Sequence, residues 1–153
     1  MDKSDCTIHV GVGAVVFKGD DVLIIKRGKA PFKGAWSIPG GRLEYGETVR
    51  DAVTREVREE TAIEIRIIDL LDVFDATPEA RGDAFDNHTV IIDYVATWVA
   101  GVPVAGDDAI EAEFVSFDEA IARLSWDKTR EALTKARAIR DAAHGRLGAI
   151  KSL

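Results

Sequence analysis

Three glutamates stand close together in one predicted helix. Glu56, Glu59 and Glu60 occupy positions i, i+3 and i+4, and residues three or four apart share a helical face. Carboxylates this close repel one another, and burial raises that cost, unless a cation neutralises them. Oxygen ligands without Cys or His favour Mg²⁺, with Mn²⁺ as the alternative. The pattern predicts a divalent-cation site, although three glutamates alone are equally compatible with an acidic, solvated helix.

The apolar stripe of the same helix lies beside these carboxylates. It consists of Val49, Val53 and Val57. Glu56 and Glu60 point along the edge of this stripe, whereas a helix with a purely structural role would carry them on its wet face. The position of the two glutamates therefore favours the cation site.

The segment 41–63 resembles the Nudix box, the pattern G-x5-E-x7-R-E-U-x-E-E-x-G-U in which U is aliphatic. The matching residues are Gly41, Glu47, Arg55, Glu56, Val57, Glu59, Glu60 and Ile63. Ala62 stands where the family usually has glycine. Because the carboxylates precede Ala62, we expect this departure to alter the helix exit more than the chemistry. The likeness extends from about Ile8 to Ala120.

The resemblance implies a role for each conserved type of side chain in the box. The expected metal ligands are Glu56, Glu60, Glu59 and the carbonyl of Gly41 or its neighbour Gly40. Glu47 and Arg55 are expected to form a structural ion pair that fixes the loop against the helix. Arg55, four residues before Glu59, can orient a glutamate without filling the site.

The general base varies in this family between a box glutamate and a carboxylate of a later loop. Glu59 is the candidate within the box. Glu111 is the candidate in the later loop, with Asp108 as its alternative. A solvated acidic loop explains Glu111 and Asp108 equally well.

Other residues are candidates for substrate contact. Arg27 and Lys29 follow a predicted strand end and can meet phosphate, a surface role being the alternative. His88 is a substrate-binding candidate, although a lone histidine is more often structural. Trp36 can stack on a base or pack its own loop. Pro78 falls fifteen residues after the box, a spacing similar to that of ADP-ribose-cleaving Nudix enzymes.

The resemblance implies an enzyme. A carboxylate-held Mg²⁺ suits hydrolysis of a phosphoanhydride bond by attack of water on phosphorus. The expected substrate is a nucleoside diphosphate linked to another group, with ADP-ribose as the leading interpretation. A nucleoside triphosphate pyrophosphohydrolase is one alternative. A nucleotide-sensing module without catalysis is the other, although such modules commonly lose box carboxylates that this chain keeps.

Composition agrees with a small soluble enzyme. The chain has 153 residues and a net charge of −7, so an extended nucleic-acid surface is not expected. Cys6 is the single cysteine, which excludes an intrachain disulfide. Neither a leader segment nor a membrane-spanning run is evident, and we expect a cytoplasmic protein with a small nucleotide-type substrate.

The pattern of apolar residues predicts the elements that position these side chains. Strands are predicted at 11–17, 21–26, 63–74, 89–99 and 113–117, and helices at 48–61, 118–124 and 127–143. Segments 28–40 and 75–87 are predicted loops, the second being the expected specificity loop. This order fits an α/β fold with a mixed sheet, and the resemblance implies the α/β/α sandwich of the Nudix fold. We expect one domain, 1–153, with a core at about 8–120 and C-terminal helices at about 118–143. The sequence leaves the oligomeric state open, and an edge-like strand at 89–99 can pair in a homodimer.

Overall fold

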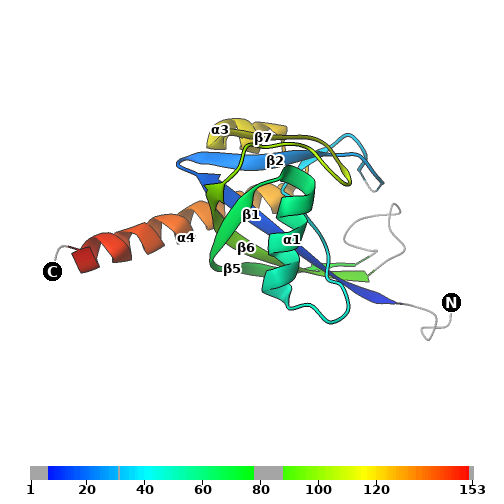
Figure 1. Cartoon of the computed structure of the whole chain (residues 1–153), viewed down its shortest axis with the longest axis horizontal. Coiled ribbons are helices and arrows are strands. Elements are labelled where there is room, and N and C mark those ends of the chain that lie inside the picture. Colours follow the sequence, from blue (N-terminus) through cyan, green and yellow to red (C-terminus); the bar gives the residue numbers. More distant parts are fainter. Residues whose placement is uncertain (1–6, 31, 78–87, 152–153) are drawn as a thin grey trace.

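The computed structural model describes residues 7–30, 32–77 and 88–151, with side chains as far as residue 145. A mixed sheet is flanked by helices, as the sequence predicts (Figure 1). The strands are β1 Ile8–Lys18, β2 Asp21–Arg27, β3 Trp36–Ser37, β4 Gly40–Arg42, β5 Glu64–Ala76, β6 His88–Ala100 and β7 Ala109–Ser116. The helices are α1 Val49–Thr61, α3 Phe117–Arg123 and α4 Asp127–Lys151.

The first two strands form a fork. The two predicted strands at 11–17 and 21–26 form an antiparallel hairpin, β1–β2, in which Phe17 pairs with Val22 and Lys18 with Asp21. Beyond this joint β2 pairs with β3 and with β7, whereas β1 pairs with β4 and, in parallel, with β6. The chain segment that contains β3 and β4 therefore lies in the opening of the fork, directly before α1.

The central strand β1 is buried on both faces, which explains its nearly continuous apolar sequence. Successive side chains of a strand point to opposite sides of the sheet. Val16 packs with Val57 of α1 on one face. Val15 and Phe17 pack with Leu133 of α4 on the other. Figure 1 shows α1 in front of the sheet and α4 behind it.

Helix α1 begins and ends at defined residues. Thr48 caps its first turn, because the Thr48 hydroxyl accepts a hydrogen bond from the Asp51 N–H at 3.1 Å. At the other end Ala62 adopts the left-handed conformation, with φ 61°. This conformation costs a non-glycine residue roughly 1–2 kcal/mol, which is why glycine is the usual residue at such a helix end.

The prediction that residues 89–99 form an edge strand is wrong. β6 lies between β1 and β5 and pairs with both. The alternating apolar and polar residues of 89–99 do not reveal how many neighbours the strand has, because pairing uses the backbone. Homodimer formation stays a prediction, without the edge strand on which it was based.

Three element boundaries also differ from the prediction. The predicted loop 28–40 contains β3 and the start of β4. β7 begins at Ala109 rather than at 113, because it pairs with β2 along its whole length, so Glu111 belongs to a strand. α4 continues to Lys151 and projects beyond the sheet (Figure 1). Within the described segments, none of the helices has the length and apolar character needed to cross a bilayer.

Candidate active site

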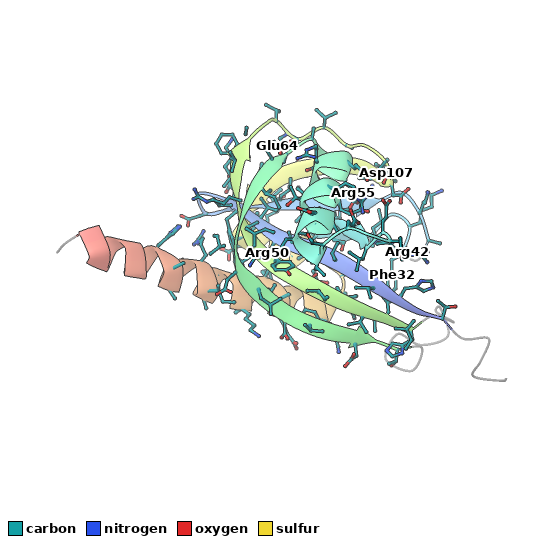
Figure 2. The ribbon with its side chains drawn as sticks, turned by 60° about the horizontal axis from the view of Figure 1, so that its bottom comes forward. Phe32, Arg42, Arg50, Arg55, Glu64 and Asp107 are labelled. Carbon is teal, nitrogen blue, oxygen red and sulfur yellow. The ribbon has the colours of Figure 1, made fainter. Side chains whose placement is uncertain are left out.

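The last turns of α1 and the loop before β7 bring carboxylates together. One oxygen from each of Glu56, Glu59 and Asp107 lies within 4.8 Å of the others. Glu56 is buried, whereas Glu59 and Asp107 are exposed. Figure 2 shows Asp107 beside α1, close to Arg55. We refer to Glu56, Glu59 and Asp107 as the carboxylate cluster.

Glu60 is held against strand β4 next to this cluster. The Gly40 N–H donates a hydrogen bond to Glu60 Oε1 at 2.8 Å. Burial raises the pKa of Glu60 to about 8, and the charges of Glu56 and Asp107 add to the effect. Burial also raises the pKa of Glu56, against the opposing influence of Arg55. Carboxyls with raised pKa values gain from a bound cation, because the cation replaces the proton that burial favours.

The two glycines of β4 leave room for this arrangement. A Cβ on Gly41 would lie 2.3 Å from the carboxyl carbon of Glu56. A Cβ on Gly40 would lie 2.2 Å from the carbonyl oxygen of Val12. A side chain at either position would collide with its neighbour, so β4 can lie between β1 and α1 because both residues are glycine.

Arg55 connects the loop before α1 with the cluster. Its Nε and Nη2 atoms donate to the two carboxylate oxygens of Glu47, at 3.0 and 2.7 Å. Nη2 also donates to the Arg42 carbonyl at 3.0 Å, and Nη1 donates to Glu56 at 2.9 Å and Glu59 at 3.1 Å. The ion pair expected from the sequence is therefore present, and Arg55 orients two cluster carboxylates as well.

The donor set fits Mg²⁺ or Mn²⁺. Carboxylate oxygens are the ligands that these hard cations prefer, and a Cβ at position 41 would displace the Glu56 carboxylate from its place. Glu56, Glu59 and Asp107 are the residues that would hold the ion. Glu60, a predicted ligand, uses one oxygen for the Gly40 N–H.

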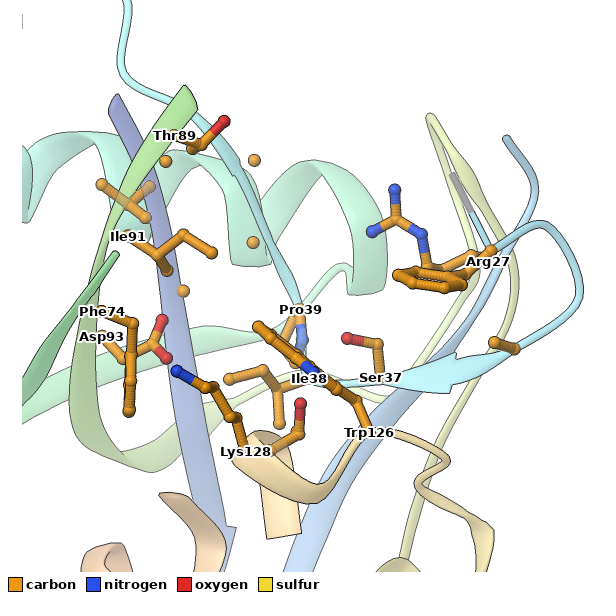
Figure 3. Close-up of a pocket in the computed structure, with 18 of the residues that line it drawn as sticks. Arg27, Ser37, Ile38, Pro39, Phe74, Thr89, Ile91, Asp93, Trp126 and Lys128 are labelled. Atoms are coloured by element: carbon orange, nitrogen blue, oxygen red, sulfur yellow. The ribbon is translucent and has the colours of Figure 1, made fainter. Parts of the chain in front are cut away.

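A cavity of about 510 Å³ lies in the fork between β1 and β2. Glu56, Glu59 and Asp107 do not line it, but Gly41, which packs against Glu56, does. Gly40 and Arg27 also line it, and Arg27 lies near Glu60 as well. Away from Arg27, Figure 3 shows Phe74, Asp93 and Lys128 together. Apolar and aromatic walls complete the cavity, contributed by Val12, Phe32, Trp36, Ile38, Ile91 and Trp126. The size and the flat side chains suit a nucleoside.

Arg27 and Trp36, both predicted to contact substrate, line this cavity. Arg27 also lines a second, smaller hollow of about 50 Å³ together with Lys29 and Glu60. Lys29 forms an ion pair of 2.6 Å with Asp108, the residue considered as an alternative base. Arg27 is thus placed to reach both the cavity and the carboxylates.

The structure does not bring Glu111 or His88 to the cluster or the cavity. Glu111 lies on β7 and forms an ion pair of 3.4 Å with Lys26. His88 starts β6, and its buried Nε2 has no hydrogen-bond partner within the part of the chain that is described. The roles assigned to both residues stay predictions. Pro78 lies outside the described residues.

Sequence reasoning missed two carboxylates that the structure places at the site. Asp107 is one residue before Asp108, the residue that was considered as an alternative base. The left-handed conformation of Asp107, with φ 50°, turns the loop there. Asp93 lines the cavity from the middle of β6. The signal that was available for Asp93 is a single charged residue within the apolar run of a central strand.

Comparison with known proteins gives the family. The model of the NUDIX domain matches residues 7–137. The chain belongs to the Nudix hydrolase family. Among its relatives is an ADP-ribose pyrophosphatase of Methanocaldococcus jannaschii, 38% identical over 119 residues, a match that covers 77% of this chain and 67% of that protein.

Two further relatives bear on the Nudix fold and activity. An 8-oxo-dGTP diphosphatase of Proteus vulgaris is 38% identical over 73 residues, which are 47% of this chain and 63% of that protein. The solved MutT NUDIX hydrolase of Burkholderia pseudomallei superposes with a TM-score of 0.69 at 31% identity, covering 84% of this chain and 98% of the other. The expected Nudix fold and enzyme class are confirmed.

Proposed function

We propose that this Nudix hydrolase is a Mg²⁺-dependent pyrophosphohydrolase, with Mn²⁺ as the alternative ion. It cleaves the phosphoanhydride bond of a nucleoside diphosphate linked to another group, with ADP-ribose as the leading substrate. The proposal covers residues 1–153 as one Nudix domain.

The juxtaposition of cluster and cavity carries this proposal. The oxygens of Glu56, Glu59 and Asp107 lie within 4.8 Å of one another, and the cavity of about 510 Å³ begins at Gly41, which packs against Glu56. A nucleoside in the cavity would present its diphosphate to the carboxylate end. Arg27, which lines the cavity at that end, supplies a positive charge for phosphate oxygens.

We assign ion binding and water activation to different side chains. Glu56, Glu59 and Asp107 would hold the divalent ion, which would supply charge neutralisation for phosphate and acidification of water. Glu59 is the most exposed member of α1 in the cluster, with 44% of its side chain accessible, and we assign to it the orientation and deprotonation of water. Arg55 donates to Glu59 at 3.1 Å and keeps its carboxylate in place. Glu111 is the alternative base.

The leading substrate is supported by similarity to a named relative. The Methanocaldococcus jannaschii protein, matched over 77% of this chain, is an ADP-ribose pyrophosphatase. The shorter match to the 8-oxo-dGTP diphosphatase, over 47% of the chain, favours a nucleoside triphosphate as the second candidate. The complete set of box carboxylates opposes a sensing module without catalysis.

The deciding experiment is a substrate panel with Mg²⁺ in which products are identified by mass. ADP-ribose should give AMP and ribose 5-phosphate. Glu56→Gln and Glu60→Gln should each lower kcat by about 100-fold or more while the protein stays folded. Glu64→Gln is the matched control, because Glu64 is a surface residue paired with Arg58 beyond the end of α1.

Several outcomes would contradict the proposal. Turnover at the wild-type rate in Glu60→Gln would remove the assignment of the metal site. Failure of Mg²⁺ and Mn²⁺ to promote cleavage of any nucleotide in the panel would favour the sensing module. Glu59→Gln and Glu111→Gln, compared in parallel, separate the two candidate bases by the size of the loss in kcat.

A further inference from the structure

Asp93 is a buried carboxyl that faces the cavity. It lies in the middle of β6, opposite Gly13 of β1, and is 6% exposed. Figure 3 shows its carboxyl turned into the cavity beside Phe74. Throughout the described segments this carboxyl has neither a hydrogen bond nor an ion pair to another side chain or backbone group.

Leaving such a group buried and unpaired is costly for the protein. A buried polar group without a partner destabilises the fold, and an unpaired buried charge destabilises it more. Burial raises the pKa of Asp93 to about 7, and the charge of Asp72 adds to this effect. The carboxyl is thus protonated in a substantial fraction of molecules near neutral pH, and then it can both donate and accept a hydrogen bond.

The walls around Asp93 suit a flat ring. Phe74, Ile91 and Trp126 line the cavity with it, and apolar or aromatic surfaces stack favourably on a nucleobase. A cation is also present at this end, since Lys128 lines the same cavity. A ligand here would be held by its faces and recognised by its edge through Asp93.

The position of Asp93 within the cavity agrees with the direction of the proposed substrate. Gly41 and Arg27 line the end next to the carboxylate cluster, whereas Asp93 lies with Phe74 away from Arg27 (Figure 3). A nucleoside diphosphate that places its phosphates at the cluster would extend its base toward Asp93.

We propose that Asp93 recognises the adenine edge of the substrate, accepting a hydrogen bond from the 6-amino group and donating one to ring nitrogen N1. This inference rests on the proposed function, because it requires a nucleotide in the cavity. Guanine presents two adjacent donors on the corresponding edge and needs an ionised carboxylate, which the apolar surroundings of Asp93 disfavour. Asp93 thereby sets the base specificity of the enzyme.

Calorimetric titration with AMP in the presence of Mg²⁺ tests the proposal, because AMP has the base but no phosphoanhydride bond to cleave. Asp93→Ala should weaken AMP binding by about tenfold or more. Asp93→Asn should stay within about threefold of wild type, since the amide offers the same pair of one donor and one acceptor. Purine riboside 5′-monophosphate, which lacks the 6-amino group but keeps N1, should bind wild type more weakly than AMP does and should lose less affinity than AMP loses in Asp93→Ala.

Asp72 provides the matched control. It pairs with Asp93 across the β5–β6 ladder but forms an ion pair with Lys135 and does not line the cavity. Asp72→Ala and Asp72→Asn should weaken AMP binding far less than Asp93→Ala does, because Asp72 acts on Asp93 only through its charge. The melting temperature of Asp93→Ala should not fall below that of Asp72→Ala, because the substitution removes an unpaired buried group.

The inference is overturned if AMP does not bind wild type, if Asp93→Ala binds AMP like wild type, or if Asp93→Asn loses as much affinity as Asp93→Ala. Tighter binding of GMP than of AMP would overturn it too. Its failure differs from failure of the proposed function. Selective AMP binding through Asp93 without cleavage of any nucleotide in the panel would overturn the proposed function alone, whereas cleavage with unaltered AMP binding in Asp93→Ala would overturn the inference alone.

Discussion

The carboxylate cluster and Asp93 lie at the two ends of the proposed substrate site, and each end includes a buried carboxyl. At the cluster end the protein supplies partners, because Arg55 donates to Glu56 and the Gly40 N–H donates to Glu60. At the other end Asp93 has no partner within the described chain. The difference teaches that the cluster end is organised before any ligand arrives, whereas the Asp93 end is complete only with a ligand.

The largest effect is expected from one added methyl group at the carboxylate cluster. In Gly41→Ala the new Cβ would stand 2.3 Å from the Glu56 carboxyl carbon. The Glu56 side chain is flexible and can move aside, so the fold should persist while kcat for ADP-ribose falls by about 100-fold. Gly145→Ala, where a Cβ meets open space, is the control for steady-state kinetics. A kcat near wild type would show that the position of Glu56 is unimportant.

The same change at the other end should act on binding. In Gly13→Ala the Cβ would lie 2.5 Å from Asp93 Oδ1 and would displace the carboxyl from its place. We expect KM for ADP-ribose to rise by about tenfold and kcat to stay within about twofold. Gly11→Ala, whose Cβ would meet its nearest neighbour at 3.4 Å, should raise KM less. A fall in kcat as large as that of Gly41→Ala would erase the distinction between the two ends.

Stability as a function of pH sharpens the comparison further. Burial raises the pKa of Glu60 to about 8 and that of Asp93 to about 7. A carboxyl whose pKa is higher in the folded state keeps a proton that the unfolded chain has lost, so stability falls as pH rises toward the folded value. The melting temperature of the metal-free protein should fall by roughly 5 °C between about pH 5.5 and about pH 8.5.

Mg²⁺ should distinguish the two ends, because its effect on the melting temperature depends on the cluster end alone. The ion should raise the melting temperature more at the higher pH, because Glu60 and Glu56, whose pKa values burial raises, have then lost the protons with which a cation competes. Glu60→Gln should reduce both the pH slope and the effect of Mg²⁺, whereas Asp93→Asn should reduce the slope alone. Equal effects of Mg²⁺ in wild type and Glu60→Gln would contradict this separation.

The smallest predicted effect lies outside both ends, at the helix exit. Ala62 has φ 61°, and Ala62→Gly should stabilise the protein by roughly 0.5–1 kcal/mol. Chemical denaturation measures the change, and kcat and KM should stay at wild-type values because Ala62 follows the ligands. A loss of activity in Ala62→Gly would connect the helix exit to the site.

The contrast between the ends also explains what the sequence could predict. Glu56, Glu59 and Glu60 lie within one helix, so their spacing alone predicts a shared face, and the loop partner Glu47 is close in sequence. The apolar runs likewise predicted most strands and all three helices. Such local relations can be read directly from the order of residues.

Contacts between distant segments could not be read in this way. Asp107 joins the cluster because the loop after β6 returns to the end of α1, where the Gly106 N–H donates to the Glu60 carbonyl at 3.1 Å. Asp93 faces the cavity because β6 pairs with β1 in a parallel register that sets it opposite Gly13. The extent of β7 similarly depends on its partner β2, which placed Glu111 in a strand.

The two sides of the fork between β1 and β2 carry different parts of the proposed site of this enzyme. The residues proposed to carry the reaction lie on the β4–α1 side, where a Cβ on Gly40 or Gly41 would meet a neighbouring group at 2.2 or 2.3 Å. The opposite wall is carried partly by the segment that follows β2, which can lengthen or change its side chains without disturbing the hairpin joint at Phe17 and Val22. Because β1 and β2 diverge beyond their joint, substitutions in the segment after β2 can change the shape of the cavity while the carboxylates of α1 stay in place.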